Sequence, residues 1–167
     1  MPTLYLLIGG NQSDRRQMIN DATDLIRQRI GSVVDSSHIY ETAPWGTFAD
    51  GETVQSFYNQ AQKVETTLTP HEALKEALRI ERLLGRRRKA GITAYTSRPI
   101  DVDLIFYDSL VIVTPDLTLP HPRMHLRRFV LEPMCEIAAD YIHPSLNKTL
   151  RQLLDECTDT SSCCRCC

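Results

Sequence analysis

Asp101 and Asp103 stand two residues apart in a stretch, 100–107, whose apolar residues alternate as in a half-buried strand. Residues i and i+2 of a strand point to the same face, about 7 Å apart. Aspartate is rare in strands, and neighbouring carboxylates raise each other's pKa unless a cation lies between them. A divalent metal ion is the simplest such cation. A solvated outer face that carries two ordinary aspartates is the alternative.

Basic residues lie close to this pair in the sequence. Residues 86–89 read Arg-Arg-Arg-Lys, and Arg98 comes three residues before Asp101. Metal-holding carboxylates beside guanidinium groups suit polyphosphate transfer, because the metal bridges phosphate oxygens while the arginines clamp the rest. Basic residues at a helix C-terminus also complement the helix dipole, so a solvated surface is the alternative. The sequence has no P-loop or dinucleotide fingerprint, so a phosphate site must be built from side chains.

Two more polar residues have positions that suit either chemistry or structure. Glu81 falls on the apolar stripe of a predicted helix, and a buried carboxylate needs a partner. Arg86 or Arg88 would supply that partner as a salt bridge. His121 lies between two prolines, which restrict the local backbone. A histidine held in this way suits a phosphate or base contact, and a loop histidine without a role is the alternative.

The elements that must position these residues follow from hydrophobic periodicity. Strands are predicted at 4–8, 33–40, 57–65, 100–107 and 110–113. Helices are predicted from a cap near Ser13 to Gly31, at 69–85, at 123–138 with an interruption at Pro133, and at 145–156. This order predicts an α+β domain with helices packed on an antiparallel sheet. The connection at 42–55 is longer than usual, and such loops are often functional.

Size and charge exclude several classes of protein. The chain has 167 residues and a net charge of −2, so no basic field favours nucleic acid. The N-terminus lacks the pattern of a signal peptide, and no apolar run has the length of a transmembrane helix. We therefore expect a cytoplasmic monomer that binds neither nucleic acid nor membranes, with a single domain over 1–157.

Cysteines crowd the end of the chain. Five of the six lie from Cys157 onward, after or within a segment rich in Thr, Ser and Asp. Dense thiolates can bind a soft metal, but this spacing is not the paired pattern of a structural zinc site. We expect a disordered tail over 158–167.

Motifs along nearly the whole chain match one family pattern. They are Ile-Gly-Gly-Asn at 8–11, Tyr-Glu-Thr-Ala-Pro-Trp-Gly at 40–46, Phe-Tyr-Asn at 57–59, the segments 81–89 and 98–104, Leu-Pro-His at 119–121 and Arg-Arg-Phe-Val-Leu at 127–131. With these motifs the chain resembles the 6-hydroxymethyl-7,8-dihydropterin pyrophosphokinases of folate biosynthesis. It departs from the pattern at Gly10, commonly serine, and at 94–97, where the family commonly has a basic residue, an aromatic residue, Gly and Pro.

The resemblance implies a ferredoxin-like αβα fold, a mainly antiparallel sheet with helices on both faces. It also implies a Mg²⁺-dependent transfer of diphosphate from ATP to the pterin hydroxymethyl group, with release of AMP. Asp101 and Asp103 would hold two Mg²⁺ ions, and Arg86 and Arg98 would clamp phosphates. The nucleotide would contact Leu74, Leu78, Glu81, Arg88, Lys89, Tyr95, Leu104, Thr118, His121 and Arg127. The pterin would lie between Phe57 and Phe129, with polar contacts from Asn59 and from Thr42, Ala43, Pro44 and Trp45.

Two other functions compete with this one. A different metal-dependent phosphoryl-transfer enzyme would share the aspartates but would not need Phe57, Asn59 and Phe129. A non-enzymatic ferredoxin-like module that binds RNA would present aromatic and basic residues together on its sheet. The acidic pair and the net charge of −2 disfavour that module.

Overall fold

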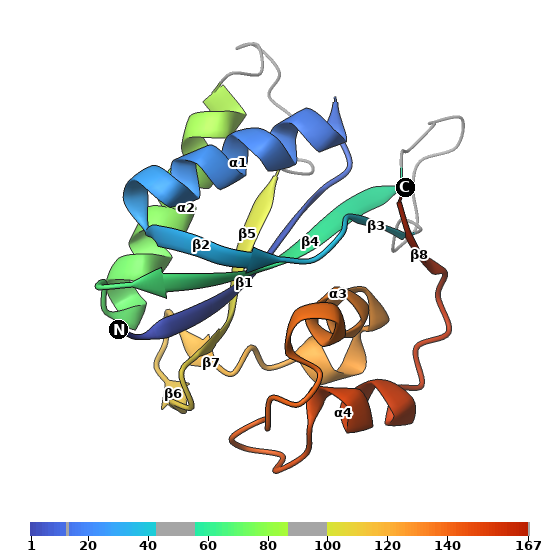
Figure 1. Cartoon of the computed structure of the whole chain (residues 1–167). Helices are drawn as coiled ribbons and strands as arrows, with labels where there is room; N and C mark the ends of the chain where they lie inside the picture. The colour runs from blue at the N-terminus through green and yellow to red at the C-terminus, as the bar shows by residue number, and fades with distance from the viewer. Residues whose placement is uncertain (13, 43–55, 87–99, 167) are drawn as a thin grey trace.

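The structure, a computed structural model, describes residues 1–12, 14–42, 56–86 and 100–166, with the backbone alone at Arg86. Within these ranges one antiparallel sheet has six strands, in the order β5-β1-β4-β3-β8, and β2 pairs with β4 beside β3 (Figure 1). The strands are β1 (Thr3–Gly10), β2 (Gly31–Ser36), β3 (Tyr40–Thr42), β4 (Phe57–Thr66), β5 (Asp101–Tyr107) and β8 (Cys163–Arg165). β6 (Ile112–Val113) and β7 (Thr118–Leu119) form a separate small hairpin.

Helices cover both faces of the sheet (Figure 1). They are α1 (Arg15–Arg29), α2 (Pro70–Arg86), α3 (Arg128–Ala138), α4 (Leu150–Glu156) and a 3-10 turn at Met124–Leu126. The period-two alternation of β1 divides the core, because Leu4 and Leu6 pack with α1 and α2 while Tyr5 and Leu7 pack with α3 and α4. The predicted α+β arrangement is therefore confirmed.

Several predicted elements differ from the observed ones; for example, the helix predicted from 123 begins only at Arg128, after the 3-10 turn. The strand predicted at 33–40 is divided into β2 and β3, because the Ser37 hydroxyl accepts the Ala61 N–H at 2.9 Å in place of a backbone carbonyl. The helix predicted from Ser145 begins only at Leu150, since Thr149 and Gln152 form a capping box there. Helix α3 continues through Pro133, its sixth residue, which lacks an N–H and so leaves out one helical hydrogen bond.

The C-terminal segment differs from the expected disordered tail. Strand β8 extends the sheet at the open edge of β3, and the Cys166 N–H donates to the Ile39 carbonyl at 2.7 Å. Upstream of β8, Asp159 Oδ2 accepts the Arg128 N–H at 3.0 Å. An unpaired strand edge offers backbone partners to any segment that reaches it, which sequence periodicity does not reveal. No helix in the described ranges is long and apolar enough to cross a membrane.

Candidate active site

Gly9 joins the aspartate pair to the middle of the sheet. In the strand register, Gly9 of β1 lies opposite Asp101 on one side and opposite Asn59 of β4 on the other. A Cβ atom at Gly9 would lie 2.2 Å from Asn59 Oδ1, closer than such atoms approach. Glycine at this position therefore lets the Asn59 side chain lie across β1, on the face that carries both carboxylates.

A cavity of about 250 Å³ opens above this part of the sheet, and we call it the sheet-face pocket. Its floor comes from β1, β3, β4 and β5, and one wall comes from the start of α3. Asn59 Nδ2 donates to Thr42 Oγ1 at 3.2 Å, and both side chains are buried. The lining residues are Leu7, Gly9, Thr42, Phe57, Asn59, Asp101, Asp103, Arg127 and Phe129.

A second cavity, of about 300 Å³, lies along the outer edge of β5, and we call it the edge pocket. Helix α2 forms one side and the segment 115–122 forms the other. Its lining residues are Leu74, Leu78, Glu81, Val102, Asp103, Leu104, Pro115, Asp116, Leu117, Thr118, His121 and Pro122. Asp103 lines both pockets, so a group bound at this carboxylate lies within reach of the contents of each.

Glu81 holds the backbone between the two aspartates. Its Oε2 accepts the Val102 N–H at 2.8 Å, and only 8% of the residue is exposed. A salt bridge to Arg86 or Arg88 was one of two interpretations of the sequence, but those side chains lie outside the described part of the chain. The described partner is a backbone amide of β5, and sequence spacing gives no signal for such a contact.

His121 fastens the 115–122 segment to β5. Its backbone N–H donates to the Ile105 carbonyl at 3.0 Å, while its ring Nδ1 accepts the Arg123 backbone N–H at 3.2 Å. Burial lowers the pKa of His121, and the nearby Arg127 and Arg123 charges lower it further. The ring is therefore neutral at pH 7, and because Nδ1 is an acceptor, Nε2 carries the proton and serves as a donor.

The structure brings most of the described candidate residues together in these two pockets. Thr42, Phe57, Asn59 and Phe129 line the sheet-face pocket. Arg127, which was predicted to contact the nucleotide, lines this pocket as well, and its guanidinium lies 5.7 Å from the Phe129 ring centroid. The edge pocket gathers Leu74, Leu78, Glu81, Leu104, Thr118 and His121. The side chain of Arg86 is not described, and outside the described residues lie Ala43, Pro44, Trp45, Arg88, Lys89, Tyr95 and Arg98.

Sequence reasoning missed several lining residues. Gly9 had a usable signal, because a glycine inside a strand pattern often marks a close backbone approach. Leu7 and Val102 had none, since each reads as an ordinary strand residue. Asp116 and Leu117 reach the edge pocket only through the fold of the hairpin segment.

Known proteins resemble the chain along most of its length. The model of the family 7,8-dihydro-6-hydroxymethylpterin-pyrophosphokinase matches residues 5–139. A 2-amino-4-hydroxy-6-hydroxymethyldihydropteridine pyrophosphokinase from Porphyromonas gingivalis is 35% identical, over 86% of this chain and 95% of that protein. One of the same name from Aquifex aeolicus is 32% identical, over 98% of both chains.

A solved structure supports the fold alone. The HPPK-DHPS protein of Plasmodium falciparum matches 93% of this chain with a TM-score of 0.74 at 17% identity, and this chain spans 43% of that chain. The family match and the relatives above together decide the family. The chain belongs to the 7,8-dihydro-6-hydroxymethylpterin-pyrophosphokinase family, whose reaction transfers pyrophosphate from ATP to hydroxymethyldihydropterin in folate synthesis.

Proposed function

We propose that this chain transfers diphosphate from ATP to the hydroxymethyl group of 6-hydroxymethyl-7,8-dihydropterin and releases AMP. The observation that carries this proposal is the position of Asp103, which lines both the sheet-face pocket and the edge pocket. A reaction between two substrates needs two adjacent sites with the catalytic charge between them. The sheet-face pocket then takes the pterin and the edge pocket takes the nucleotide.

The residues of the sheet-face pocket suit a flat heterocycle rich in donors and acceptors. Phe57 and Phe129 offer aromatic faces to the same cavity. The Asn59 amide and the Thr42 hydroxyl offer polar groups at its floor, where their mutual hydrogen bond holds both in place. A phosphoryl-transfer enzyme for another substrate would not need this combination.

The residues of the edge pocket suit a nucleotide. Leu74, Leu78 and Leu104 supply apolar surface for a base, and Leu78 is 38% exposed, so a ligand can reach it. His121 offers its Nε2–H to a phosphate oxygen as a neutral donor. In addition, we assign Arg86 and Arg98 as phosphate clamps, with Arg88, Lys89, Tyr95 and Thr118 as further nucleotide contacts. These assignments rest on the family resemblance.

The aspartate pair fits magnesium. Within the described residues, no group of three or more His, Cys, Asp or Glu side chains gathers as a complete metal cage. Mg²⁺ commonly binds one or two carboxylates and completes its coordination with water and substrate phosphates. Asp101 and Asp103 would hold two Mg²⁺ ions, which supply charge neutralisation at the triphosphate when bound.

Positioning and charge supply the catalysis in this proposal. The pterin hydroxyl attacks the β-phosphorus of ATP in line, so the protein must hold the two substrates in that orientation. Glu81 contributes by fixing the Val102 amide and with it the spacing of the two carboxylates. A monomeric state, a cytoplasmic location and a single domain over 1–157 remain predictions from the sequence.

A coupled assay for AMP tests the proposed function. AMP should form from ATP only when both 6-hydroxymethyl-7,8-dihydropterin and Mg²⁺ are present, and a chelator should stop the reaction. ADP as the product, or AMP formation that does not depend on the pterin, would contradict the proposal.

A further inference from the structure

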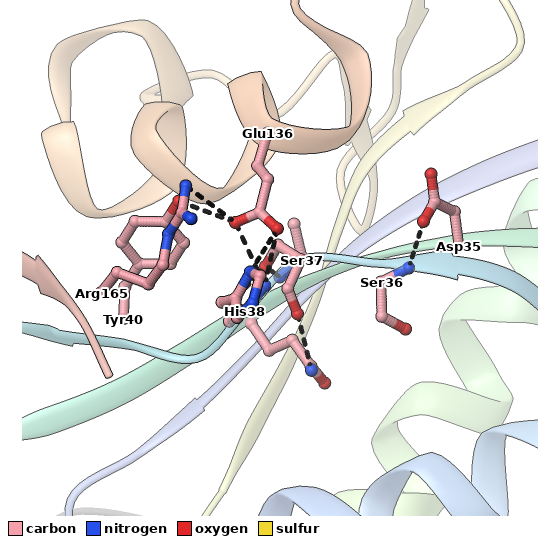
Figure 2. Close-up of polar contacts among 9 residues, drawn as sticks. Asp35, Ser36, Ser37, His38, Tyr40, Glu136 and Arg165 are labelled. Carbon is pink, nitrogen blue, oxygen red and sulfur yellow. Dashed lines mark hydrogen bonds and ion pairs between the residues drawn. The ribbon is translucent and has the colours of Figure 1, made fainter. Parts of the chain in front are cut away.

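Glu136 of α3 makes a group of contacts that lies outside both pockets (Figure 2). Its Oε1 and Oε2 each accept the His38 backbone N–H at 3.1 Å, and Oε2 lies 2.7 Å from His38 Nδ1. The Tyr40 hydroxyl donates to Oε1 at 2.8 Å. Arg165 Nη2 of β8 lies 3.9 Å from the same oxygen. One carboxylate of α3 thus binds Tyr40 of β3, His38 two positions before β3, and Arg165 of the C-terminal strand.

The protonation states of these groups favour the contacts. Burial opposes the charge on Glu136, but hydrogen bonds from Tyr40 and His38 hold the pKa of that carboxyl below its usual value. Burial and the hydrogen bond to Glu136 raise the pKa of Tyr40 to about 12. At neutral pH the Glu136 carboxylate is therefore ionised and the Tyr40 phenol is protonated. A hydrogen bond to an ionised acceptor is stronger than one between two neutral groups.

The same two elements carry walls of the sheet-face pocket. Phe129 precedes Glu136 by seven residues on α3, which is two helical turns, so the two share one side of the helix about 10 Å apart. Tyr40 and Thr42 are two residues apart in β3 and point to one face of the strand. Helix α3 therefore has Phe129 in the pocket and Glu136 two turns away. Strand β3 has Thr42 in the pocket and Tyr40, a partner of Glu136, two residues away.

Strand β3 is short, and Glu136 ties it to α3. It is three residues long and pairs with β4 and β8 within the sheet, and such pairing sets its position in the plane of the sheet. The distance from the sheet to α3 depends instead on side chains between the two layers. At β3 Glu136 is such a side chain, because it accepts the hydrogen bond of the Tyr40 hydroxyl across the two layers.

We propose that Glu136 is a positioning residue for the sheet-face pocket, holding Thr42 of β3 and Phe129 of α3 at the separation that a flat heterocycle requires. This inference rests on the proposed function, because it assigns the pterin to that pocket. Glu136 touches neither substrate. Its loss therefore weakens pterin binding. The edge pocket should be unchanged, because neither β3 nor α3 lines it.

Variants of the Glu136 group test this inference by substrate affinity. Glu136→Gln keeps the side-chain shape but replaces an oxygen acceptor with an amide donor, and Tyr40→Phe removes one partner. We expect Glu136→Gln to raise the Kd for the pterin about three- to tenfold, with the Kd for ATP changed less than about twofold. Tyr40→Phe should have a smaller effect, because Glu136 keeps its contacts with His38 and Arg165. The double variant should bind the pterin no more weakly than Glu136→Gln alone, because both substitutions disrupt the same Tyr40–Glu136 hydrogen bond.

Glu132→Gln is the matched control. Glu132 lies one turn earlier on α3 and pairs with Arg128 of the same helix at 3.0 Å, so its loss breaks an ion pair without touching β3. This variant should bind the pterin as the unaltered chain does. An unchanged pterin Kd in folded Glu136→Gln, or an equal loss for pterin and ATP, would overturn the inference.

Hydrogen exchange separates failure of this inference from failure of the proposed function. In the protein without ligands, the backbone amides of 38–42 should exchange faster in Glu136→Gln than in Glu132→Gln, whatever the chain catalyses. Equal exchange in the two variants would overturn the positioning role. If Glu136→Gln does not fold, Tyr40→Phe replaces it in the comparison with Glu132→Gln. If the unaltered chain forms no pterin-dependent AMP, the proposed function is overturned instead.

Discussion

The sheet-face pocket and the edge pocket share Asp103 but are built in different ways. The floor of the sheet-face pocket is the sheet itself, where Gly9 lies between Asp101 and Asn59 in strand register. The edge pocket depends on side chains of α2 and on a segment that His121 attaches to the outer edge of β5. Strand register determines the floor of the sheet-face pocket, whereas docking of separate elements determines the edge pocket. A substitution should therefore affect one substrate, unless it falls on the shared carboxylate.

Asp103→Asn should have the largest effect because it acts on both pockets. The substitution keeps the side-chain shape and removes the negative charge that would hold Mg²⁺ and the triphosphate between the substrates. We expect turnover to fall by at least about a hundredfold, with little change in the free energy of unfolding. AMP release and thermal unfolding measure the two quantities.

Asp108→Asn is the control for Asp103→Asn, because Asp108 follows the far end of β5 and lies outside both pockets. Its Oδ1 accepts the Thr3 N–H at 2.8 Å, a structural contact. Near-normal turnover in Asp103→Asn would contradict the role of Asp103 as the catalytic charge shared by the two pockets.

Gly9→Ala should separate the pockets by damaging the floor of one. The new Cβ would lie 2.2 Å from Asn59 Oδ1, so the Asn59 side chain must move away from its hydrogen bond with Thr42. We expect pterin affinity to fall about tenfold or more and ATP affinity to change little, with a loss of about 1–3 kcal/mol in the free energy of unfolding. Titration with each substrate measures the difference.

Gly31→Ala tells a loss of stability from a loss of the pocket. A Cβ atom at Gly31 would lie 2.1 Å from the Glu65 carbonyl oxygen, which belongs to backbone and moves less easily than a side chain. This variant should lose at least as much stability as Gly9→Ala and keep the pterin affinity of its folded fraction. If both glycine variants lose pterin affinity equally, Gly9 has no special part in the floor.

The same contrast between register and docking explains which features the sequence predicted. Period-two alternation placed Asp101 and Asp103 on one face, and that face is continuous with the pocket floor. Helix α2 was predicted to within a residue because Thr69 and Glu72 form its capping box, and the two reciprocal hydrogen bonds are present. Such local signals depend on residues close together in the sequence.

Features that depend on distant residues were not predictable in this way. The partner of Glu81 is the Val102 amide, 21 positions away, and its contact arises only when α2 packs beside β5. Strand β8 forms because β3 leaves an open edge, a property of the assembled sheet. The roles of Arg88, Lys89, Tyr95 and Arg98 remain predictions, since these residues lie outside the described ranges.

Glu81→Ala should act mainly on the edge pocket, which Glu81 itself lines. It removes the acceptor of the Val102 N–H, which is then left buried without that partner. We expect the free energy of unfolding to fall by about 1–3 kcal/mol and ATP affinity to fall about tenfold, more than pterin affinity. Glu81→Gln keeps an oxygen acceptor and should recover most of both losses. A larger loss for pterin than for ATP would reverse the assignment of the pockets.

His121→Gln should have the smallest effect, which appears in the dependence of stability on pH. Burial, with the charges of Arg127 and Arg123, lowers the pKa of His121 below its usual value of 6.5 in the folded state. As the pH falls, His121 therefore takes up a proton in the unfolded chain before it does so in the folded chain, and folding must release that proton. Stability from this group is complete above about pH 6.5 and declines as the pH falls toward the lower folded pKa.

Removing the titrating ring should flatten that decline. Between about pH 7.5 and about pH 5.5, the free energy of unfolding of His121→Gln should fall less steeply than that of the unaltered chain. His143, whose pKa burial also lowers, keeps part of the slope in both proteins. Thr118→Ser, in the same pocket, titrates no group and should retain the full slope. If His121→Gln retains it as well, His121 is not held neutral by the fold, and its Nε2–H cannot be the fixed donor of the edge pocket.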